Sequence, residues 1–477
     1  MKKEGFEVAL EQNEKRMIEI KSPLNGEVIG SVPAMTQSEV DETIARSKNA
    51  LKEWKKVPLY ERADMLYRCA QLLLDKEDEL ANLLVREVAK DLKSAKSEVS
   101  RTADFIRFTA DIAKSMHGET IQSDRFPGFE NNKISLVTRD PIGVVLAISP
   151  FNYPVNLAAS KLAPALVAGN TVVFKPATQG ALSGQFLAEV FYEAGFSRDV
   201  LTVITGKGSE IGDYVVTHKD INFINFTGST EVGSHISQIT CMVPLMMELG
   251  GKDAAIVLED ADIELAAKNI VAGGFSYSGQ RCTAVKRILV VEEVADKLVA
   301  RLKELIEELP IGNPLEKQVT IVPLINSSAA DFVCELMEDA SKKGAKLIIG
   351  EKREGNLIYP TLYDYVTTEM RLAWEEPFGP VLPVMRVKNM EEAIEIANAS
   401  EYGLQSSIFS ENIDRAFYVA DKLEVGTVQI NNKTERGPDH FPFLGVKSSG
   451  LGTQGIRYSI ETMTRPKATV INLRTPD

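Results

Sequence analysis

The spacing of hydrophobic positions changes along the chain and marks its main regions. Between Thr36 and about Lys114, apolar residues recur every three or four positions, which predicts a series of amphipathic helices. We expect the first helix to begin at Thr36, because a threonine followed three residues later by a glutamate can form a capping box. Ahead of it, short apolar runs on either side of Asn25-Gly26 predict two short strands.

From Val144 onward, short apolar runs alternate with helix-length segments. This alternation predicts right-handed βαβ crossovers and parallel sheets. A first series extends to about residue 240, and a second α/β stretch runs from about Asp253 to Val446. Strands are expected in the segments "VVLAISP", "TVVFKP", "VLTVITG" and "INFINFTGS" of the first series, and in "DAAIVLE", "RILVVE", "KLIIG", "PVLPVMRV", "QSSIFS" and "GTVQINN" of the second.

Two segments fall outside this alternation. Residues 118–143 contain two extended runs around a Pro-Gly turn, which predicts a ribbon outside the main sheet. The late run "RPKATVINLR" predicts a strand that follows the second α/β stretch. We expect this strand to pair either with the ribbon or with a sheet edge of another subunit.

Composition excludes several classes of protein. The chain has 477 residues, 44% of them hydrophobic and 25% charged, which suits a globular protein of two or three domains. A net charge of −13 argues against nucleic-acid binding and against a polybasic membrane anchor. No apolar run approaches the ~18 residues of a membrane helix, and "MKKEGFEVALEQNEK" lacks the apolar core of a signal peptide. Four scattered cysteines without a CxxC pair predict a cytoplasmic protein with reduced thiols and no metal site.

A glycine pattern suggests a phosphate-binding turn. In "FTGSTEVG", Gly228 and Gly233 follow a predicted strand and open a helix, whose free N–H groups favour an anion. An ordinary βα turn has the same spelling, so this pattern is weak alone. Lys175 ends another strand of the series, with Thr178 three residues later and no carboxylate near. An NAD site usually has an acidic residue there, whereas a cation and a hydroxyl suit a 2′-phosphate. The alternative is an ordinary surface lysine.

Three residues are candidates for the chemistry. Asn152 follows a predicted strand, where its amide can donate to an oxygen. Glu248 precedes two glycines and is a candidate general base, the alternative being a surface carboxylate. Cys282 lies among small polar residues, and its alternative role is that of a buried structural cysteine. The four histidines stand in no catalytic pattern, which disfavours a Cys–His mechanism.

Taken in order along the chain, these motifs resemble the aldehyde dehydrogenase superfamily. They are "PFN" with Asn152, Gly228-Ser229, "ELGGKD" from Glu248, "GQRC" with Cys282, and "EEPFGPV". Within the superfamily, "SYSGQRCTAVKR", "AISPFNYPVN" and "QINNKTERGPDHFPFLG" are similar to the NADP-dependent non-phosphorylating glyceraldehyde-3-phosphate dehydrogenases. The resemblance covers essentially the whole chain.

The resemblance implies an α/β fold of the aldehyde dehydrogenase type. It consists of a Rossmann-type cofactor domain (1–117 and 141–249), an α/β catalytic domain (250–445) and a small β oligomerisation ribbon (118–140 and 446–477). The expected assembly is a homotetramer.

The resemblance also implies a role for each motif residue. Cys282 is the expected nucleophile, Asn152 and the N–H of Cys282 hold the oxyanion, and Glu248 activates the water that hydrolyses the thioester. The expected cofactor is NADP, bound by Ser149, Lys175, Thr178, Asp213, Gly228, Ser229, Gly233, Leu249 and Glu376, the last at the nicotinamide ribose. The expected substrate site consists of Arg101, Asn152, Tyr153, Arg281, Thr283 and Arg436, among which the arginines and the tyrosine hold a phosphate.

The expected reaction is the irreversible oxidation of D-glyceraldehyde 3-phosphate to 3-phosphoglycerate, with a small phosphorylated aldehyde as partner and neither nucleic acid nor membrane. The same chemistry on another anionic aldehyde, such as succinate semialdehyde, is the alternative. Transfer of the acyl group to coenzyme A is disfavoured by Glu248. A non-catalytic binding role is disfavoured because Cys282, Glu248 and Asn152 are all intact.

Overall fold

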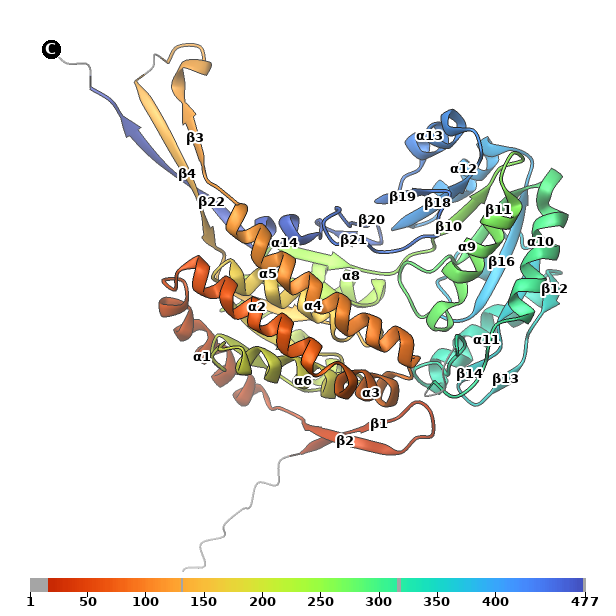
Figure 1. Cartoon of the computed structure of the whole chain (residues 1–477), viewed down its shortest axis with the longest axis horizontal. Coiled ribbons are helices and arrows are strands. Elements are labelled where there is room, and N and C mark those ends of the chain that lie inside the picture. Colours follow the sequence, from red (N-terminus) through yellow and green to blue (C-terminus); the bar gives the residue numbers. More distant parts are fainter. Residues whose placement is uncertain (1–15, 130–131, 315–318, 475–477) are drawn as a thin grey trace, which may run out of the picture.

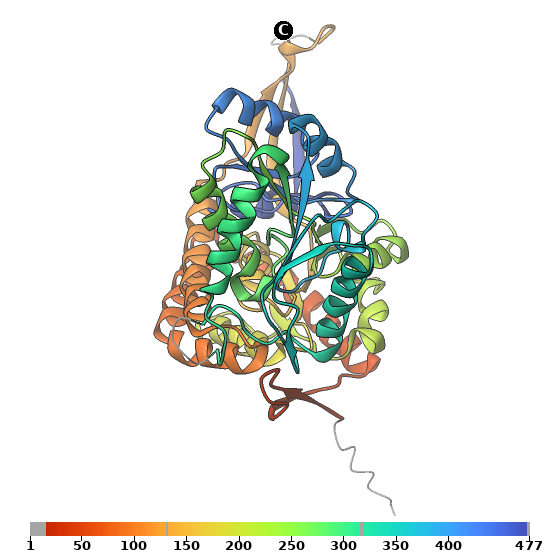
Figure 2. The same cartoon turned by 90° about the vertical axis from the view of Figure 1, so that its right-hand side faces the viewer.

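The structure is a computed structural model that describes residues 16–129, 132–314 and 319–474. Two α/β bodies lie side by side, and a slender β-ribbon projects from the first (Figures 1 and 2). No helix in the described residues is long and apolar enough to cross a membrane.

The N-terminal part is a two-stranded hairpin followed by four helices, which confirms the predicted short strands and the predicted helical region. The capping box at Thr36 is formed: its hydroxyl accepts the N–H of Glu39, and the Glu39 carboxylate accepts the N–H of Thr36 at 2.8 Å. The elements are β1 (Met17–Lys21), β2 (Val28–Pro33), α1 (Gln37–Trp54), α2 (Leu59–Asp75), α3 (Glu77–Val88) and α4 (Leu92–Ser115).

A six-stranded sheet forms the centre of the first body, in the order β21-β9-β8-β5-β6-β7. Its strands are β5 (Val144–Ile148), β6 (Thr171–Lys175), β7 (Leu201–Val203), β8 (Phe223–Thr227), β9 (Leu245–Glu248) and β21 (Gly450–Leu451), and its helices are α5 (Asn156–Val167), α6 (Ala181–Glu193), α7 (Gly208–Val216) and α8 (Thr230–Ile239). All neighbours are parallel except β21, so the predicted alternation is confirmed. The chain order reverses between β5 and β8, which is where α/β sheets bind ligands.

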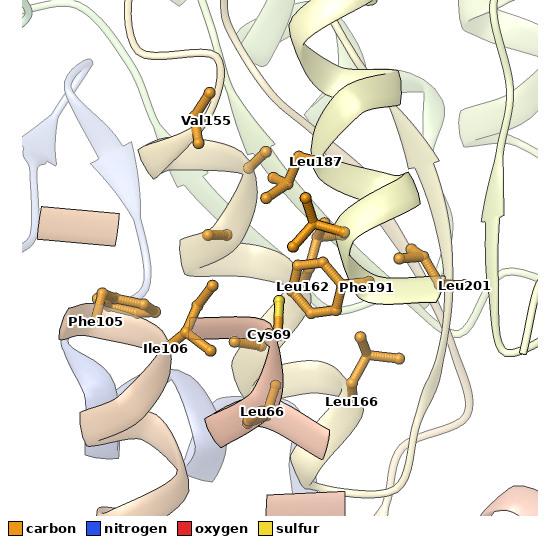
Figure 3. Packing of buried hydrophobic residues seen from close by; sticks show 14 of the residues in the cluster. Leu66, Cys69, Phe105, Ile106, Val155, Leu162, Leu166, Leu187, Phe191 and Leu201 are labelled. Carbon is orange, nitrogen blue, oxygen red and sulfur yellow. The ribbon is translucent and has the colours of Figure 1, made fainter. Parts of the chain in front are cut away.

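A large core of this body lies between the helices α2, α4, α5 and α6 and the six-stranded sheet (Figure 3). Leu66 and Cys69 of α2, Leu162 of α5 and Phe191 of α6 meet in one cluster of buried side chains. Every residue of α5 is buried, so this helix shows no amphipathic pattern. Burial without a neighbouring cation raises the pKa of the Cys69 thiol well above its usual value, which makes it a packing residue.

A seven-stranded sheet forms the second body, in the order β12-β15-β16-β11-β10-β18-β19. Its neighbours are parallel except β12 and β15. The strands are β10 (Ala254–Val257), β11 (Arg287–Val291), β12 (Lys346–Ile349), β15 (Thr361–Asp364), β16 (Val381–Val387), β18 (Gln405–Phe409) and β19 (Thr427–Ile430). The helices are α9 (Ile263–Phe275), α10 (Glu292–Glu307), α11 (Ser327–Lys342), α12 (Met390–Asn398) and α13 (Ile413–Lys422). Two-residue pairs outside this sheet are β13 (Arg353–Glu354) with β14 (Leu357–Ile358), and β17 (Tyr402–Gly403) with β20 (Val446–Lys447).

The ribbon contains three antiparallel strands in the order β22-β4-β3. They are β3 (Glu119–Gln122), β4 (Lys133–Pro141) and the C-terminal β22 (Thr464–Asn472). Of the two expected partners for the late strand, the ribbon of its own chain is the one it pairs with, over nine residues. Residues 446–463 lie elsewhere: β21 joins the six-stranded sheet, and α14 (Ile456–Thr462) packs on α4 and α5.

Candidate active site

The parallel strands of the first sheet bring several expected cofactor residues to one edge. Ile148 is in register with Lys175, and Thr227 with Glu248. Ser149 donates its N–H to the carbonyl of Lys175 at 3.3 Å. Ser149, Lys175, Gly228 and Leu249 therefore stand at the carboxyl ends of β5, β6, β8 and β9, beside the point where the strand order reverses.

Two polar groups at this edge are buried without a partner. The Ser149 hydroxyl forms no hydrogen bond to the described residues. Lys175 is 6% exposed, and burial alone lowers its pKa to about 8, with no charged group in the described chain contributing. A buried ammonium without an anion is costly. With the partly buried Thr178 hydroxyl three residues on, this pair fits the phosphate-bearing ribose of NADP.

The two glycines of the turn have a packing role. A Cβ at Gly233 would lie 2.3 Å from Leu249 Cδ2, so the glycine lets α8 pack directly on the residue after β9. A Cβ at Gly228 would lie 2.4 Å from the Phe226 ring. Ser229 is the N-cap of α8, where its hydroxyl accepts the N–H of Val232 at 3.3 Å. The N–H groups at the start of α8 that have no partner among the described residues are the ones expected to bind an anion.

Asp213 lies on the outer surface of the first body. Its carboxylate contacts Nε2 of His235 at 2.9 Å, which joins α7 to α8, and both side chains are exposed. A cavity of about 550 Å³ opens on the other side of α8, where Gly233 and Leu249 line it. The expected cofactor residues thus border α8 on more than one side.

The loop that carries Cys282 has a constrained backbone. Tyr277 and Ser278 both have a φ of 52°, a left-handed conformation that costs about 1–3 kcal/mol per residue. The Tyr277 hydroxyl donates to the carbonyl of Val88 at 2.6 Å. The Ser278 hydroxyl donates to the carbonyl of Val322 at 2.7 Å and accepts the N–H of Val322 at 2.8 Å. These buried bonds hold the turn in place just before the nucleophile.

Four charged groups surround the partly exposed Cys282 thiol. Burial raises the pKa of Cys282 to about 11. The positive charges of Lys286 and Arg436 act to lower that pKa, and the negative charges of Glu248 and Asp253 act to raise it. The structure therefore brings Glu248 and Cys282 together as the sequence predicts, with two cations that favour the thiolate.

Glu248 is buried and ion-paired. Arg436 Nη1 lies 3.1 and 2.9 Å from the two carboxylate oxygens, and the Thr227 hydroxyl donates to one of them at 3.3 Å. Lys161 Nζ donates in turn to the Thr227 hydroxyl at 2.6 Å. Burial lowers the pKa of Lys161 to about 8. Glu248 therefore has a cation and a hydrogen-bonded chain beside it.

Asn152 lies against the nucleophile loop. Its Nδ2 donates to the carbonyl of Gln280 at 3.0 Å, and its Oδ1 accepts the N–H of Tyr153 at 3.1 Å. Because a primary amide carries two N–H groups, one remains to donate to an oxyanion beside Cys282.

The expected phosphate residues are partly gathered. Arg101 and Tyr153 line one cavity of about 480 Å³, and Arg436 lines another of about 290 Å³. Asp439 joins the two: it accepts Arg101 Nη2 at 2.9 Å and Arg101 Nε at 3.1 Å, and lies 3.7 Å from Arg436 Nε. Arg101 is thus paired with Asp439, and Arg436 is paired with Glu248.

Arg281 and Thr283 lie outside these two cavities. The Arg281 side chain is buried, and Nη2 donates to the carbonyl of Gly273, which fastens the nucleophile loop to α9. The carbonyl of Thr283 accepts the hydroxyl of Thr434 at 2.9 Å. The sequence predicts Arg281 in the phosphate site, whereas the structure turns its guanidinium to the protein backbone.

Glu376 lies beside the Gly250-Gly251 turn. Its Oε1 accepts the N–H of Gly251 at 3.3 Å and is 3.1 Å from Lys286 Nζ. The next aromatic residue, Phe378, packs edge-on against Phe151 with ring centroids 6.0 Å apart. The two loops that carry Asn152 and Glu376 are thus in contact.

Sequence reasoning missed Lys161, Thr227, Lys286 and Asp439. Lys161 had a usable signal, because it is the one charged residue in the twelve of α5. Lys286 stands inside a quoted motif, where only the folded loop reveals its partners. Asp439 likewise stands inside the segment "QINNKTERGPDHFPFLG", and its pairing with Arg101 is visible only in the fold.

Comparisons with known proteins identify the family. The family model described as "Aldehyde dehydrogenase family" matches residues 10–469. An NADP-dependent glyceraldehyde-3-phosphate dehydrogenase of Streptococcus equinus is 56% identical over 96% of both chains, and that of Pisum sativum is 51% identical over 93% of this chain and 90% of the relative. The crystal structure of the NADP-dependent glyceraldehyde-3-phosphate dehydrogenase from Bacillus halodurans C-125, complexed with NADP, superposes with a TM-score of 0.95, at 56% identity and 96% coverage of both chains. The family model spans almost the whole chain, and the relatives are 51–56% identical to it, so the chain belongs to the aldehyde dehydrogenase family.

Proposed function

We propose that this chain catalyses the NADP-dependent, irreversible oxidation of D-glyceraldehyde 3-phosphate to 3-phosphoglycerate. The observation that carries the proposal is the convergence of Cys282, Glu248 and Asn152 beside two arginines that Asp439 bridges. The names of the relatives supply the substrate and the cofactor.

In this proposal Cys282 attacks the aldehyde carbon as a thiolate. Lys286 and Arg436 favour that anion, because their charges lower the pKa of Cys282. The carbonyl oxygen becomes an oxyanion as the C–S bond forms. The free N–H of Asn152 Nδ2 and the backbone N–H of Cys282 donate to it, and one such donor lowers the barrier by ~3 kcal/mol.

The residues at the sheet edge hold NADP. Lys175, with Ser149 and Thr178, binds the phosphate of the adenosine ribose, the start of α8 faces the diphosphate, and Glu376 binds the nicotinamide ribose. Bound NADP supplies the acceptor for the hydride that leaves the substrate carbon, after which the acyl group remains on Cys282 as a thioester.

Glu248 then activates water. The carboxylate leaves Arg436, accepts a proton from a water molecule and directs the oxygen to the acyl carbon. The C–S bond breaks, the acid departs and Cys282 is restored. Water rather than coenzyme A is the acceptor, because a buried base adjoins the thiol.

A matrix of substrates and cofactors tests the proposal. NADP and NAD are each measured against glyceraldehyde 3-phosphate, unphosphorylated glyceraldehyde and succinate semialdehyde. The expected result is the highest kcat/KM for glyceraldehyde 3-phosphate with NADP, and loss of all oxidation in Cys282→Ala. A higher value for succinate semialdehyde would assign the arginines to a carboxylate, and turnover by Cys282→Ala would remove the nucleophile.

We further propose a domain division and an assembly. The cofactor domain consists of residues 1–117 and 141–249, the catalytic domain of 250–445, and the ribbon of 118–140 with the C-terminal strand. Residues 446–463 go with the first domain, since β21 and α14 pack there. A homotetramer is proposed because the ribbon exposes the apolar side chains of Ile121, Leu136, Val470 and Ile471. Light scattering after gel filtration should give four times the chain mass.

A cytoplasmic location is proposed because all four cysteines are free, including the exposed Cys241. Cell fractionation tests this, and recovery outside the cytoplasm would contradict it.

A further inference from the structure

Lys286 joins the nucleophile to a second loop. The residue stands four positions after Cys282 and is 2% exposed. Its Nζ donates to the backbone carbonyl of Cys282 and lies 3.1 Å from Glu376 Oε1. A single buried ammonium therefore contacts both the backbone of the nucleophile and the carboxylate expected at the nicotinamide ribose.

The contacts of Glu376 leave one oxygen free for a ligand. Oε1 is held by Lys286 and by the N–H of Gly251 at 3.3 Å. Oε2 lies against Gly250, where a Cβ would come within 2.3 Å of it, and no described residue hydrogen-bonds to Oε2. Lys286 thus holds the carboxylate through Oε1, and Oε2 keeps its capacity to accept a hydrogen bond.

The neighbouring lysine shows that this arrangement is specific. Lys252 is also buried, but its Nζ donates to the carbonyl of Glu375 at 2.6 Å. Among the positive charges that lower the pKa of Cys282, that of Lys286 has the largest effect. The backbone of Lys286 is itself held, because its N–H donates to the carbonyl of Asp253 at 2.9 Å.

We propose that Lys286 is a positioning residue that ties Glu376 to the nucleophile loop, so that binding of the nicotinamide ribose at Glu376 and the reactivity of Cys282 are coupled. The proposal rests on the proposed function only in its use of NADP, and it is independent of which aldehyde is oxidised. Lys286 acts through its neighbours and touches no reacting atom.

The electrostatics support the direction of this coupling. Burial raises the pKa of Cys282, and the positive charge of Lys286 opposes that rise more than that of Arg436. Loss of the ammonium should therefore raise the pKa of the thiol and release Glu376 from its fixed orientation.

Alkylation of the cofactor-free enzyme by iodoacetamide measures the first effect. Against a background that contains only Cys282 (Cys69, Cys241 and Cys334 changed to Ser or Ala), we expect Lys286→Met to slow alkylation at pH 7.5 by ~10-fold, which corresponds to about one pH unit in the thiol pKa. Lys286→Arg should restore the rate to within ~3-fold, because the charge is kept. An unchanged profile in Lys286→Met would overturn the proposal.

The coupling is measured by repeating the alkylation with saturating NADP. NADP should change the alkylation rate of the wild type but not that of Lys286→Met or Glu376→Gln. The double variant should likewise show no response of its alkylation rate to NADP. The Kd of NADP should stay within ~3-fold in Lys286→Met, because Lys286 acts on the cofactor site through Glu376. Additive effects in the double variant would contradict the proposed link.

Lys252→Met is the matched control. It removes an equally buried lysine from the adjacent turn, and the alkylation profile of Cys282 should stay unchanged. An equal shift in this control would show a general effect of losing a buried lysine and refute a specific role for Lys286. Because alkylation needs no aldehyde, an enzyme that fails to oxidise glyceraldehyde 3-phosphate but passes these tests would lose only its proposed substrate.

Discussion

Replacement of Lys175 by methionine should weaken NADP binding and stabilise the cofactor-free enzyme. Lys175 is a buried ammonium that meets no anion in the described residues, and burial lowers its pKa from the usual 10.5 to about 8. Each unit of such a difference corresponds to 1.36 kcal/mol, so the charged form costs the folded state about 3 kcal/mol as an upper bound. Methionine has a similar length and needs no anion.

The effect on stability depends on pH in a defined direction. Between about pH 8 and pH 10.5 the unfolded chain binds more protons at this residue than the folded chain, so the wild type gains stability as pH rises. The free-energy cost of burying the Lys175 charge is fully present below pH 8 and absent above pH 10.5. The Tm advantage of Lys175→Met should therefore be largest at pH 7 and should vanish toward pH 10.5.

The same variant should lose its preference for NADP. A charge-assisted hydrogen bond to the ribose phosphate is worth about 1.5–3 kcal/mol, so the Kd of NADP should rise ~10–150-fold while the Kd of NAD changes little. Calorimetry gives both constants, and scanning fluorimetry gives the Tm. Lys207→Met, an exposed lysine at the start of α7, is the control and should change neither. A lower Tm together with an unchanged NADP to NAD ratio would refute the assignment.

Three further predictions concern the reaction. Glu248→Gln should release one rapid equivalent of NADPH and then stall, as stopped-flow absorbance would show; steady cycling at the wild-type rate would exclude Glu248 as the base. Asp439→Asn should raise the KM for glyceraldehyde 3-phosphate ~2–10-fold with little change in kcat. Arg101 loses its bidentate partner, so substrate binding must immobilise its side chain at a cost of about 0.5–1.5 kcal/mol; a lower KM would contradict this. Arg281→Ala should lower kcat/KM for phosphorylated and unphosphorylated glyceraldehyde by the same factor, because the guanidinium holds the nucleophile loop to Gly273. A loss confined to the phosphorylated substrate would show that Arg281 binds the phosphate.

Local patterns were sufficient for most of the fold. The period of the apolar residues and the capping box at Thr36 depend only on neighbours in sequence, and the structure confirms them. Strands β9 and β15 are missed, and each is a four-residue strand directly after a proline. The pairing of β22 is a long-range event, so the sequence left two partners open and the structure selects one.

The candidate site divides in the same way. Motifs locate Cys282, Glu248 and Asn152, since the chemistry requires those residue types. They do not reveal that Glu248 pairs with Arg436, because that contact joins residues 188 positions apart. Nor do they show the direction of the Arg281 side chain, which is set by the carbonyl of Gly273 in the folded loop.

The pairing of β22 with β4 has a consequence for how the chain is made. Thr464 faces Pro141, so the final strand of the ribbon leaves the ribosome about 320 residues after its partner. At ~5–20 residues per second, β4 waits ~15–65 s during synthesis with one hydrogen-bonding edge open. Until then β3 covers only the opposite edge of β4. An open strand edge can recruit another nascent chain. Neighbouring chains on one polysome thus have a period in which a swapped ribbon can form, and shortening the C-terminus would extend that period indefinitely.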